Sequence, residues 1–261
     1  MNYSNNWERF WIERSEKASS DYDFDHGAWP GNEIDKLSEQ ELINFIDPHG
    51  DEIIFDAGCG TGSNIQLLSS KVKQIIGLDY CPGAIERCQR RIASSDVRNA
   101  TLMEGRVTDL PLPDHSVDKV LCLSVLQYMD DTEVTRALTE FKRILTAGGM
   151  LVLHVKNLSS LYLSSLWAIK RLKLFFGKQT KLEYYRSFGW YLKALTAAGF
   201  EILNYNSFSF FMLEKLPDRL VSLLRRFELR NYDKGIFRLD FVRRHGAELK
   251  IKARVVKAFD S

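Results

Sequence analysis

The sequence has few of the residues that build disulfide frameworks and zinc sites. Its 261 residues include four cysteines, at positions 59, 81, 88 and 122, and five histidines. No two cysteines have the Cys-x-x-Cys spacing, and no histidine lies in a cluster with them. These spacings argue against disulfides and against a bound metal, and they fit a reducing compartment. A cytoplasmic protein without a metal is therefore expected.

Long apolar runs and a strong net charge are also missing. No stretch reaches the roughly 18 uninterrupted apolar residues that a transmembrane helix needs. The first residues, 1–7, have neither the basic nor the apolar region of a signal peptide, so none is expected. Lys and Arg total 36 against 34 Asp and Glu, a net charge of +2. A nearly neutral chain gives no global attraction to nucleic acid.

The most informative segment begins with a short apolar strand at residues 52–55. Asp56 follows, and then glycine occupies every second position at 58, 60 and 62. Glycine lets a backbone turn sharply and approach a ligand closely. A helix is expected at 64–70, which completes a strand, loop and helix unit. Such a unit begins many nucleotide-binding α/β folds, including dinucleotide-binding ones, and the glycine pattern alone also fits a plain turn.

The segment 56–62, Asp-Ala-Gly-Cys-Gly-Thr-Gly, resembles motif I of the class I S-adenosylmethionine-dependent methyltransferases. An acidic residue at this strand end favours a ligand with an ammonium group over a pyrophosphate. The resemblance implies S-adenosylmethionine as cofactor and S-adenosylhomocysteine as product. It also implies a doubly wound, Rossmann-like α/β fold, with seven mostly parallel strands and an antiparallel last strand. Asp56, Gly58, Gly60 and Gly62 are the residues expected to bind the amino-acid end of the cofactor.

Asp79 ends the next predicted strand, 74–79, and precedes a helix that begins at Pro82. A carboxylate at this place can accept hydrogen bonds from both ribose hydroxyls. The combination is similar to the second motif of the family. Considered alone, an Asp after a buried strand is also an ordinary loop residue.

The segment 105–114 resembles the third motif of the family, with one departure. Where the family has an Asp that accepts from adenine, this chain has Arg106, which has donors only. Val107 can still supply its backbone amide. Arg106 either stacks on the adenine plane or points to solvent, and its presence keeps open a non-catalytic, cofactor-binding subunit as an alternative.

A predicted strand at 117–123 leads to Ser124, which the resemblance places beside the adenosine. The Asn/Asp-Pro-Pro-Tyr/Phe signature of enzymes that methylate planar nitrogens is absent here, which argues against adenine or glutamine as acceptor. A helix at 131–145, a turn at 147–149 and a strand at 150–155 follow. His154, near the end of that strand, is either a general base for a hydroxyl acceptor or a histidine bonded within the sheet.

The chain is expected to divide into an N-terminal helical extension or lid, 1–50, and a methyltransferase domain, 51–261. Ser38 is expected to cap a helix at 39–46. Helical insertions are predicted at about 158–190 and 207–247. The last segment, 248–255, alternates strictly, which predicts an antiparallel strand near an edge with one solvated face.

Basic and aromatic residues concentrate in the predicted insertions. The pattern of residues 158–176 predicts a basic amphipathic helix, which either docks on the body of the protein, lies on a membrane surface or covers an apolar substrate. Tyr184 and Tyr185 follow and are candidate catalytic residues with His154. The aromatic content of 158–211, including Phe208, Phe210 and Phe211, predicts an apolar or amphipathic acceptor.

The expected activity is methyl transfer from S-adenosylmethionine to an oxygen or carbon atom of a small molecule, in the manner of the ubiquinone and menaquinone methyltransferases that the chain resembles. Three alternatives remain. A nicotinamide dehydrogenase is disfavoured by Asp56 and by the antiparallel last strand. An RNA methyltransferase is favoured by the basic C-terminal region and disfavoured by the missing planar-nitrogen signature. The third is the non-catalytic subunit. The oligomeric state is not predicted.

Overall fold

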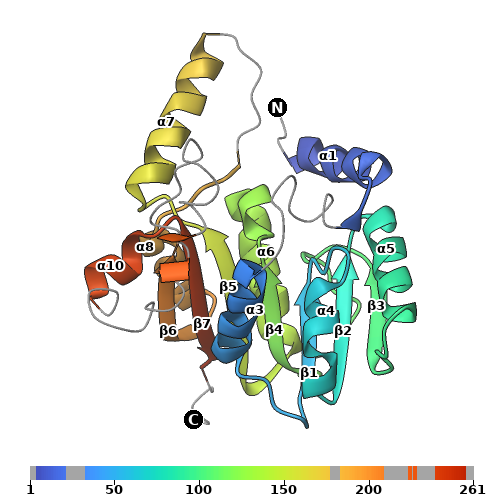
Figure 1. Ribbon diagram of the computed structural model, residues 1–261. Coiled ribbons are helices and arrows are strands. Elements are labelled where there is room, and N and C mark those ends of the chain that lie inside the picture. The colour runs from blue at the N-terminus through green and yellow to red at the C-terminus, as the bar shows by residue number, and fades with distance from the viewer. Residues whose placement is uncertain are drawn as a thin grey trace.

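A seven-stranded sheet forms the centre of the computed structural model, which describes residues 4–21, 33–176, 183–208, 223–224, 226–227 and 239–256 (Figure 1). The order across the sheet is β3-β2-β1-β4-β5-β7-β6. Neighbours from β3 to β5 are parallel, and β7 runs antiparallel to both β5 and β6. This confirms the predicted fold class. The strands are β1 (Ile53–Ala57), β2 (Gln74–Asp79), β3 (Ala100–Glu104), β4 (Val117–Leu123), β5 (Leu145–Lys156), β6 (Phe200–Phe208) and β7 (Glu248–Val255).

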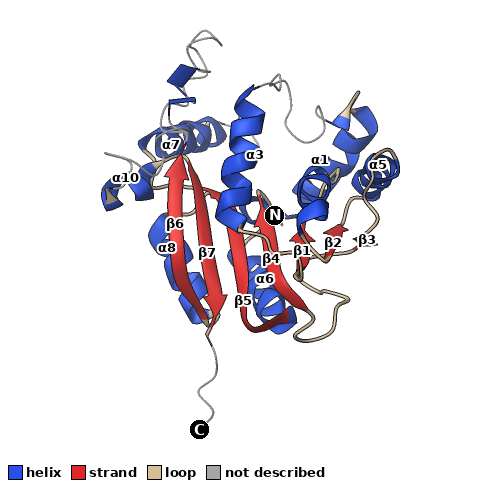
Figure 2. Ribbon diagram, turned by 60° about the horizontal axis from the view of Figure 1, so that its bottom comes forward, coloured by secondary structure: helices blue, strands red, loops and turns tan. Residues whose placement is uncertain are grey.

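Helices cover both faces of the sheet (Figure 2). Buried residues of α3, α4 and α5 pack on one face, and those of α6 and α8 pack on the other. The helices are α1 (Ser4–Lys17), α3 (Glu33–Ile46), α4 (Ser63–Leu68), α5 (Pro82–Ala93), α6 (Asp131–Ile144), α7 (Leu161–Phe175), α8 (Phe188–Ala197) and α10 (Asp240–His245), with short 3-10 turns η1 (Ser69–Lys71) and η2 (Leu126–Tyr128). No helix of the described ranges is long and apolar enough to cross a membrane.

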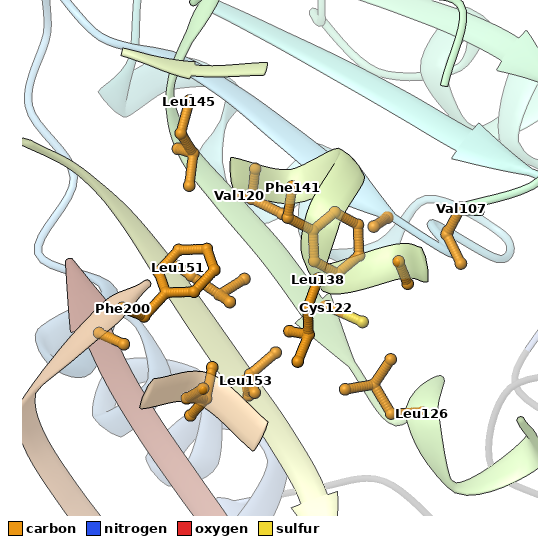
Figure 3. Packing of buried hydrophobic residues seen from close by; sticks show 14 of the residues in the cluster. Val107, Val120, Cys122, Leu126, Leu138, Phe141, Leu145, Leu151, Leu153 and Phe200 are labelled. Carbon is orange, nitrogen blue, oxygen red and sulfur yellow. The ribbon is translucent and has the colours of Figure 1, made fainter. Parts of the chain in front are cut away.

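The helix α6 shows how local sequence and packing agree. Asp130 caps it by accepting from the backbone N–H of Glu133 at 2.9 Å, and the Glu133 carboxylate accepts from the backbone N–H of Asp130 at 2.9 Å. Such a reciprocal cap satisfies two donors that a helix start leaves open. Figure 3 shows Leu138 and Phe141 of this helix in the core beside Val120 of β4. The helix is therefore fixed at its start and along its buried face.

Two predicted boundaries are wrong. Strand β5 begins at Leu145, five residues before the predicted start, because Leu145 pairs with Val117 and Met150 pairs with Lys119. The intervening residues, 146–149, bulge out of this ladder, so the predicted turn is an irregularity inside one strand. Helix α3 begins at Glu33, so Ser38 lies within the helix and does not cap it.

The strand β7 is antiparallel, as predicted, and is separated from the edge by β6. Its predicted solvated face is only partly exposed. Lys250 on that face is 4% exposed, because it contacts the Glu41 carboxylate of α3. The helix α3 therefore covers a surface that the alternating sequence assigns to solvent. Residues 22–32 of the predicted N-terminal extension or lid lie outside the described residues, as do Phe210, Phe211 and most of the predicted second insertion.

Candidate active site

The loop of residues 56–62, here called the cofactor loop, joins β1 to α4 at the carboxyl edge of the sheet. Gly58, Gly60 and Gly62 have positive φ angles of 81°, 53° and 85°, a conformation that residues with a Cβ avoid. A Cβ at Gly62 would lie 2.4 Å from Cys88 Sγ, and one at Gly58 would lie 2.4 Å from a Val125 methyl group. Glycine at these two positions is thus required by both backbone conformation and packing.

Asp79 fixes the cofactor loop to the end of β2. Its carboxylate accepts from Gly60 N at 3.0 Å and from Cys81 N at 2.9 Å, one bond to each oxygen. An ionised carboxylate has about four acceptor sites, and a ribose presents two neighbouring hydroxyls as donors. The side chain is partly exposed. This arrangement fits the ribose of S-adenosylmethionine at the place that the sequence predicts.

Asp56 lies fully buried in the centre of the sheet, at the end of β1 beside Gly77 of β2 and Leu121 of β4. The charge of Asp56 affects the pKa of the neighbouring Cys122 thiol. Burial and then the Asp56 carboxylate raise the pKa of Cys122 well above its usual range. This thiol therefore stays protonated and belongs to the core, as its position within the strand predicts.

The loop after β3 places the two predicted adenine-side residues differently. Val107 directs its side chain into the core and is 9% exposed. Arg106 is largely exposed and forms an ion pair with Glu8 of α1. Its guanidinium is thus held by the N-terminal helix, an arrangement that the sequence did not predict. The ion pair connects the adenine-side loop to the first helix of the chain.

Helix α1 lies across the carboxyl edge of the sheet and contacts two further loops there. Trp7 and Trp11 pack on Tyr128 of η2, with ring centroids 4.8 Å and 5.5 Å apart. The Tyr80 hydroxyl donates to Trp7 O at 3.5 Å, and the Cys81 thiol donates to Trp11 O at 3.7 Å. Burial raises the pKa of Tyr128 far above its usual range, so it stays protonated. Trp7, Trp11 and Tyr128 thus form a cluster of rings, here called the aromatic wall.

His154 and Ser124 meet at the ends of β5 and β4. Ser124 has a positive φ of 62°, unusual for a residue with a side chain, and its backbone N–H donates to His154 O at 2.8 Å. Its Oγ lies 3.5 Å from His154 Nδ1. On the other side of the ring, Nε2 lies 3.5 Å from a carboxylate oxygen of Glu248, whose second oxygen accepts from Lys156 Nζ at 2.7 Å. The imidazole therefore lies between a hydroxyl and a carboxylate.

The segment 183–186, which contains the predicted catalytic residues Tyr184 and Tyr185, lies beside η2. Tyr184 N donates to Gln127 O at 2.7 Å, which ties this segment to η2. The Tyr185 hydroxyl donates to the Glu183 carboxylate. Burial, and then Glu183, raise the pKa of Tyr185 well above its usual range. A phenol of this kind is a hydrogen-bond donor at neutral pH, which fits a role in holding an acceptor better than a role as base.

Arg186 is the buried support of this region. Its guanidinium donates to Leu126 O at 3.0 Å, Met129 O at 2.7 Å and Asp131 Oδ1 at 2.9 Å, and it stacks on the Trp190 ring. It thereby fixes η2, the turn that carries Gln127. Sequence reasoning missed Arg186, although a lone arginine in an aromatic run, Tyr-Tyr-Arg-Ser-Phe, was a usable signal.

Comparison with known proteins agrees with this geometry. Residues 55–153 match the profile of a methyltransferase domain family. A probable S-adenosylmethionine-dependent methyltransferase of Mycolicibacterium smegmatis is 31% identical over 104 residues, which cover 40% of this chain and 38% of that protein. A demethylmenaquinone methyltransferase of Symbiobacterium thermophilum is 28% identical over 149 residues, which cover 56% of this chain and 58% of that protein. The chain thus spans about two fifths to three fifths of these relatives.

Among solved structures, phosphoethanolamine N-methyltransferase 1 of Haemonchus contortus, in complex with phosphoethanolamine and S-adenosylhomocysteine, has a TM-score of 0.68 at 16% identity. The match covers 99% of this chain and 50% of that one. At this identity the similarity concerns the fold. The domain match, the strand order and the cofactor loop together show that this part of the chain is similar to class I S-adenosylmethionine-dependent methyltransferases.

Proposed function

We propose that the protein is an active methyltransferase that transfers the methyl group of S-adenosylmethionine to an oxygen or carbon atom of a small, apolar or amphipathic molecule. The proposed kind of acceptor is supported mainly by the aromatic wall of Trp7, Trp11 and Tyr128, which lies beside the tyrosines at 184 and 185. Aromatic rings with a few phenol hydroxyls among them favour a ligand that is mostly apolar with a small polar group. The menaquinone-precursor substrate named for one relative belongs to this class.

The cofactor-binding residues are proposed from the geometry of the carboxyl edge. Asp79 would accept from the ribose hydroxyls, and the cofactor loop with Asp56 would hold the amino-acid end. Val107 would contribute its backbone amide near the adenine, and Ser124 would lie beside the adenosine. Arg106, held by Glu8, would close the adenine side. When bound, the cofactor supplies a methyl group activated by a positively charged sulfur.

The protein contributes positioning of the acceptor and exclusion of water. Helix α1, through Trp7 and Trp11, covers the site, and Arg186 holds η2 in place. His154 is the proposed general base for a hydroxyl acceptor. Its Nε2 lies on the side of the Glu248 carboxylate and its Nδ1 on the side of Ser124, so Nδ1 is the ring nitrogen proposed to accept the proton. Glu248 is then a positioning residue for His154.

The test of the function is transfer of labelled methyl groups from S-adenosylmethionine into a cell extract of the source organism. We expect label in the organic-solvent fraction with the wild-type protein and none with Asp79→Ala, which removes the carboxylate at the ribose position. Label in RNA, in protein or in water-soluble molecules alone would contradict the proposed acceptor class. No label despite binding of S-adenosylhomocysteine would favour the non-catalytic subunit.

The role of His154 is tested by His154→Gln against a matched control, His115→Gln, a histidine that contacts Leu145 O. A lost general base lowers kcat by about 100-fold or more and removes the acidic limb of the pH–rate profile. The affinity for S-adenosylhomocysteine should stay unchanged in both variants. Turnover of His154→Gln equal to that of the control would contradict the proposal.

A further inference from the structure

The helix α7 presents an apolar face to solvent. It begins five residues after the end of β5 and extends away from the carboxyl edge of the sheet (Figure 1). Leu161 is 86% exposed and Phe175 is 83% exposed, and Ile169, Leu172 and Phe176 are at least half exposed. Large apolar side chains exposed together on one helix usually mark an interaction site.

These five residues share one side of the helix. At about 100° per residue they fall within an arc of about 120°. Leu163, which is 3% exposed, lies on the opposite side and packs against the body of the protein. On that docked side Lys170 lies 3.7 Å from the Glu183 carboxylate and 5.7 Å from the Tyr185 ring centre. The helix is therefore attached through the acceptor side of the site, while its apolar face is free of this contact.

Basic residues border the apolar face on both sides. On the same helical projection, the exposed residues Arg171 and Lys173 fall on opposite borders of the arc. Residues 161–176 contain three basic residues and no acidic one. Long cationic side chains at the borders of an apolar face can reach lipid phosphates while the apolar residues enter the acyl region. A protein partner of ordinary composition would not require this charge pattern.

We propose that α7 binds in the plane of an anionic membrane surface, with its exposed apolar face in the boundary between headgroups and acyl chains. The helix begins five residues after Lys156, which lies at the same end of β5 as His154. A protein bound in this way presents the mouth of its active site to the bilayer. Uptake of the acceptor from the membrane rests on the proposed function, whereas the binding itself does not.

The test is co-sedimentation of the full-length protein with vesicles of equal parts phosphatidylglycerol and phosphatidylcholine, compared with phosphatidylcholine alone. We expect binding to the anionic vesicles that is weakened by salt, and little binding to the neutral ones. Leu172→Asp and Phe175→Asp should each lower the partition coefficient at least about tenfold. The matched control is Leu203→Asp, an exposed leucine on β6, which should bind as the wild type does.

Binding of S-adenosylhomocysteine, measured by calorimetry without vesicles, should be equal in the wild type and all three variants. This measurement separates loss of membrane binding from loss of the cofactor site. Equal sedimentation of Phe175→Asp and wild type would overturn the proposal, as would equal binding to neutral vesicles. A wild-type dimer that Leu172→Asp converts to monomer would show that the face joins two copies of the chain instead.

Discussion

The buried contact between Lys250 and Glu41 predicts an unusual dependence of stability on pH. The two side chains are 5% and 7% exposed, and they connect β7 to α3. Burial lowers the pKa of Lys250 to about 7, while the unfolded chain has a lysine pKa of about 10.4. Between these two values the unfolded state binds more protons than the folded state. The free energy of unfolding therefore rises with pH in this window.

The size of the effect follows from the two pKa values. Each pH unit in the window contributes about 1.4 kcal/mol. From pH 7.5 to 9.0 Lys250 should therefore add about 2 kcal/mol to the free energy of unfolding. The double variant Glu41→Leu/Lys250→Met removes this contribution without leaving one charge buried alone. Replacing a buried pair with apolar residues is often neutral or stabilising, so the variant should fold at pH 7.5.

The assay is urea unfolding followed by circular dichroism at pH 7.5 and 9.0. A matched control, Glu201→Leu/Arg254→Met, removes an ion pair between β6 and β7 whose side chains are about half exposed. The control should keep the pH dependence of the wild type. Comparing the slopes cancels the contribution of Lys252, whose pKa burial also lowers. A wild-type slope in the Glu41→Leu/Lys250→Met variant would refute the reasoning.

Two further predictions concern the site. Gly62 has a positive φ, and a Cβ there would clash with Cys88, so Gly62→Ala should lower the free energy of unfolding by about 2–4 kcal/mol. In urea titrations, a loss below about 0.5 kcal/mol would contradict this geometry. Arg186→Lys leaves buried carbonyl groups without a donor, so it should destabilise by about 2–3 kcal/mol. Arg186→Lys should also lower kcat/KM for the acceptor, while its affinity for S-adenosylhomocysteine stays within about twofold of the wild-type value. An unchanged kcat/KM would show that η2 does not form the acceptor site.

The strands and the cofactor loop were predictable because their signals are local. Buried parallel strands such as β4 appear as apolar runs, and the glycines of the cofactor loop are required by their own backbone angles. Asp79 could be placed for the same reason, since it is the last residue of its strand. The start of β5 was predicted wrongly because it depends on a contact with a distant part of the chain. The pairing of Leu145 with Val117 extends the strand across two glycines that, in the sequence alone, indicate a turn.

The contacts that could not be predicted join distant parts of the chain. Glu248 reaches His154 only because β7 inserts antiparallel beside β5, and nothing near His154 in the sequence indicates this register. The ion pair of Arg106 with Glu8 likewise depends on where α1 lies. Lys250 was assigned to a solvated face because alternation shows which residues share a face and does not show what covers it.

The most direct test of the account is calorimetric titration of S-adenosylhomocysteine into the wild type, Asp79→Ala and Asp96→Ala. Asp96 is a highly exposed residue that precedes β3, at the opposite edge of the sheet. If Asp79 holds the ribose, the wild type and Asp96→Ala should bind S-adenosylhomocysteine equally. Asp79→Ala should bind it at least about tenfold more weakly, because hydrogen bonds to a charged group contribute about 1.5–3 kcal/mol. Equal affinity of Asp79→Ala and wild type, or no binding by the folded wild type, would contradict the cofactor site described above.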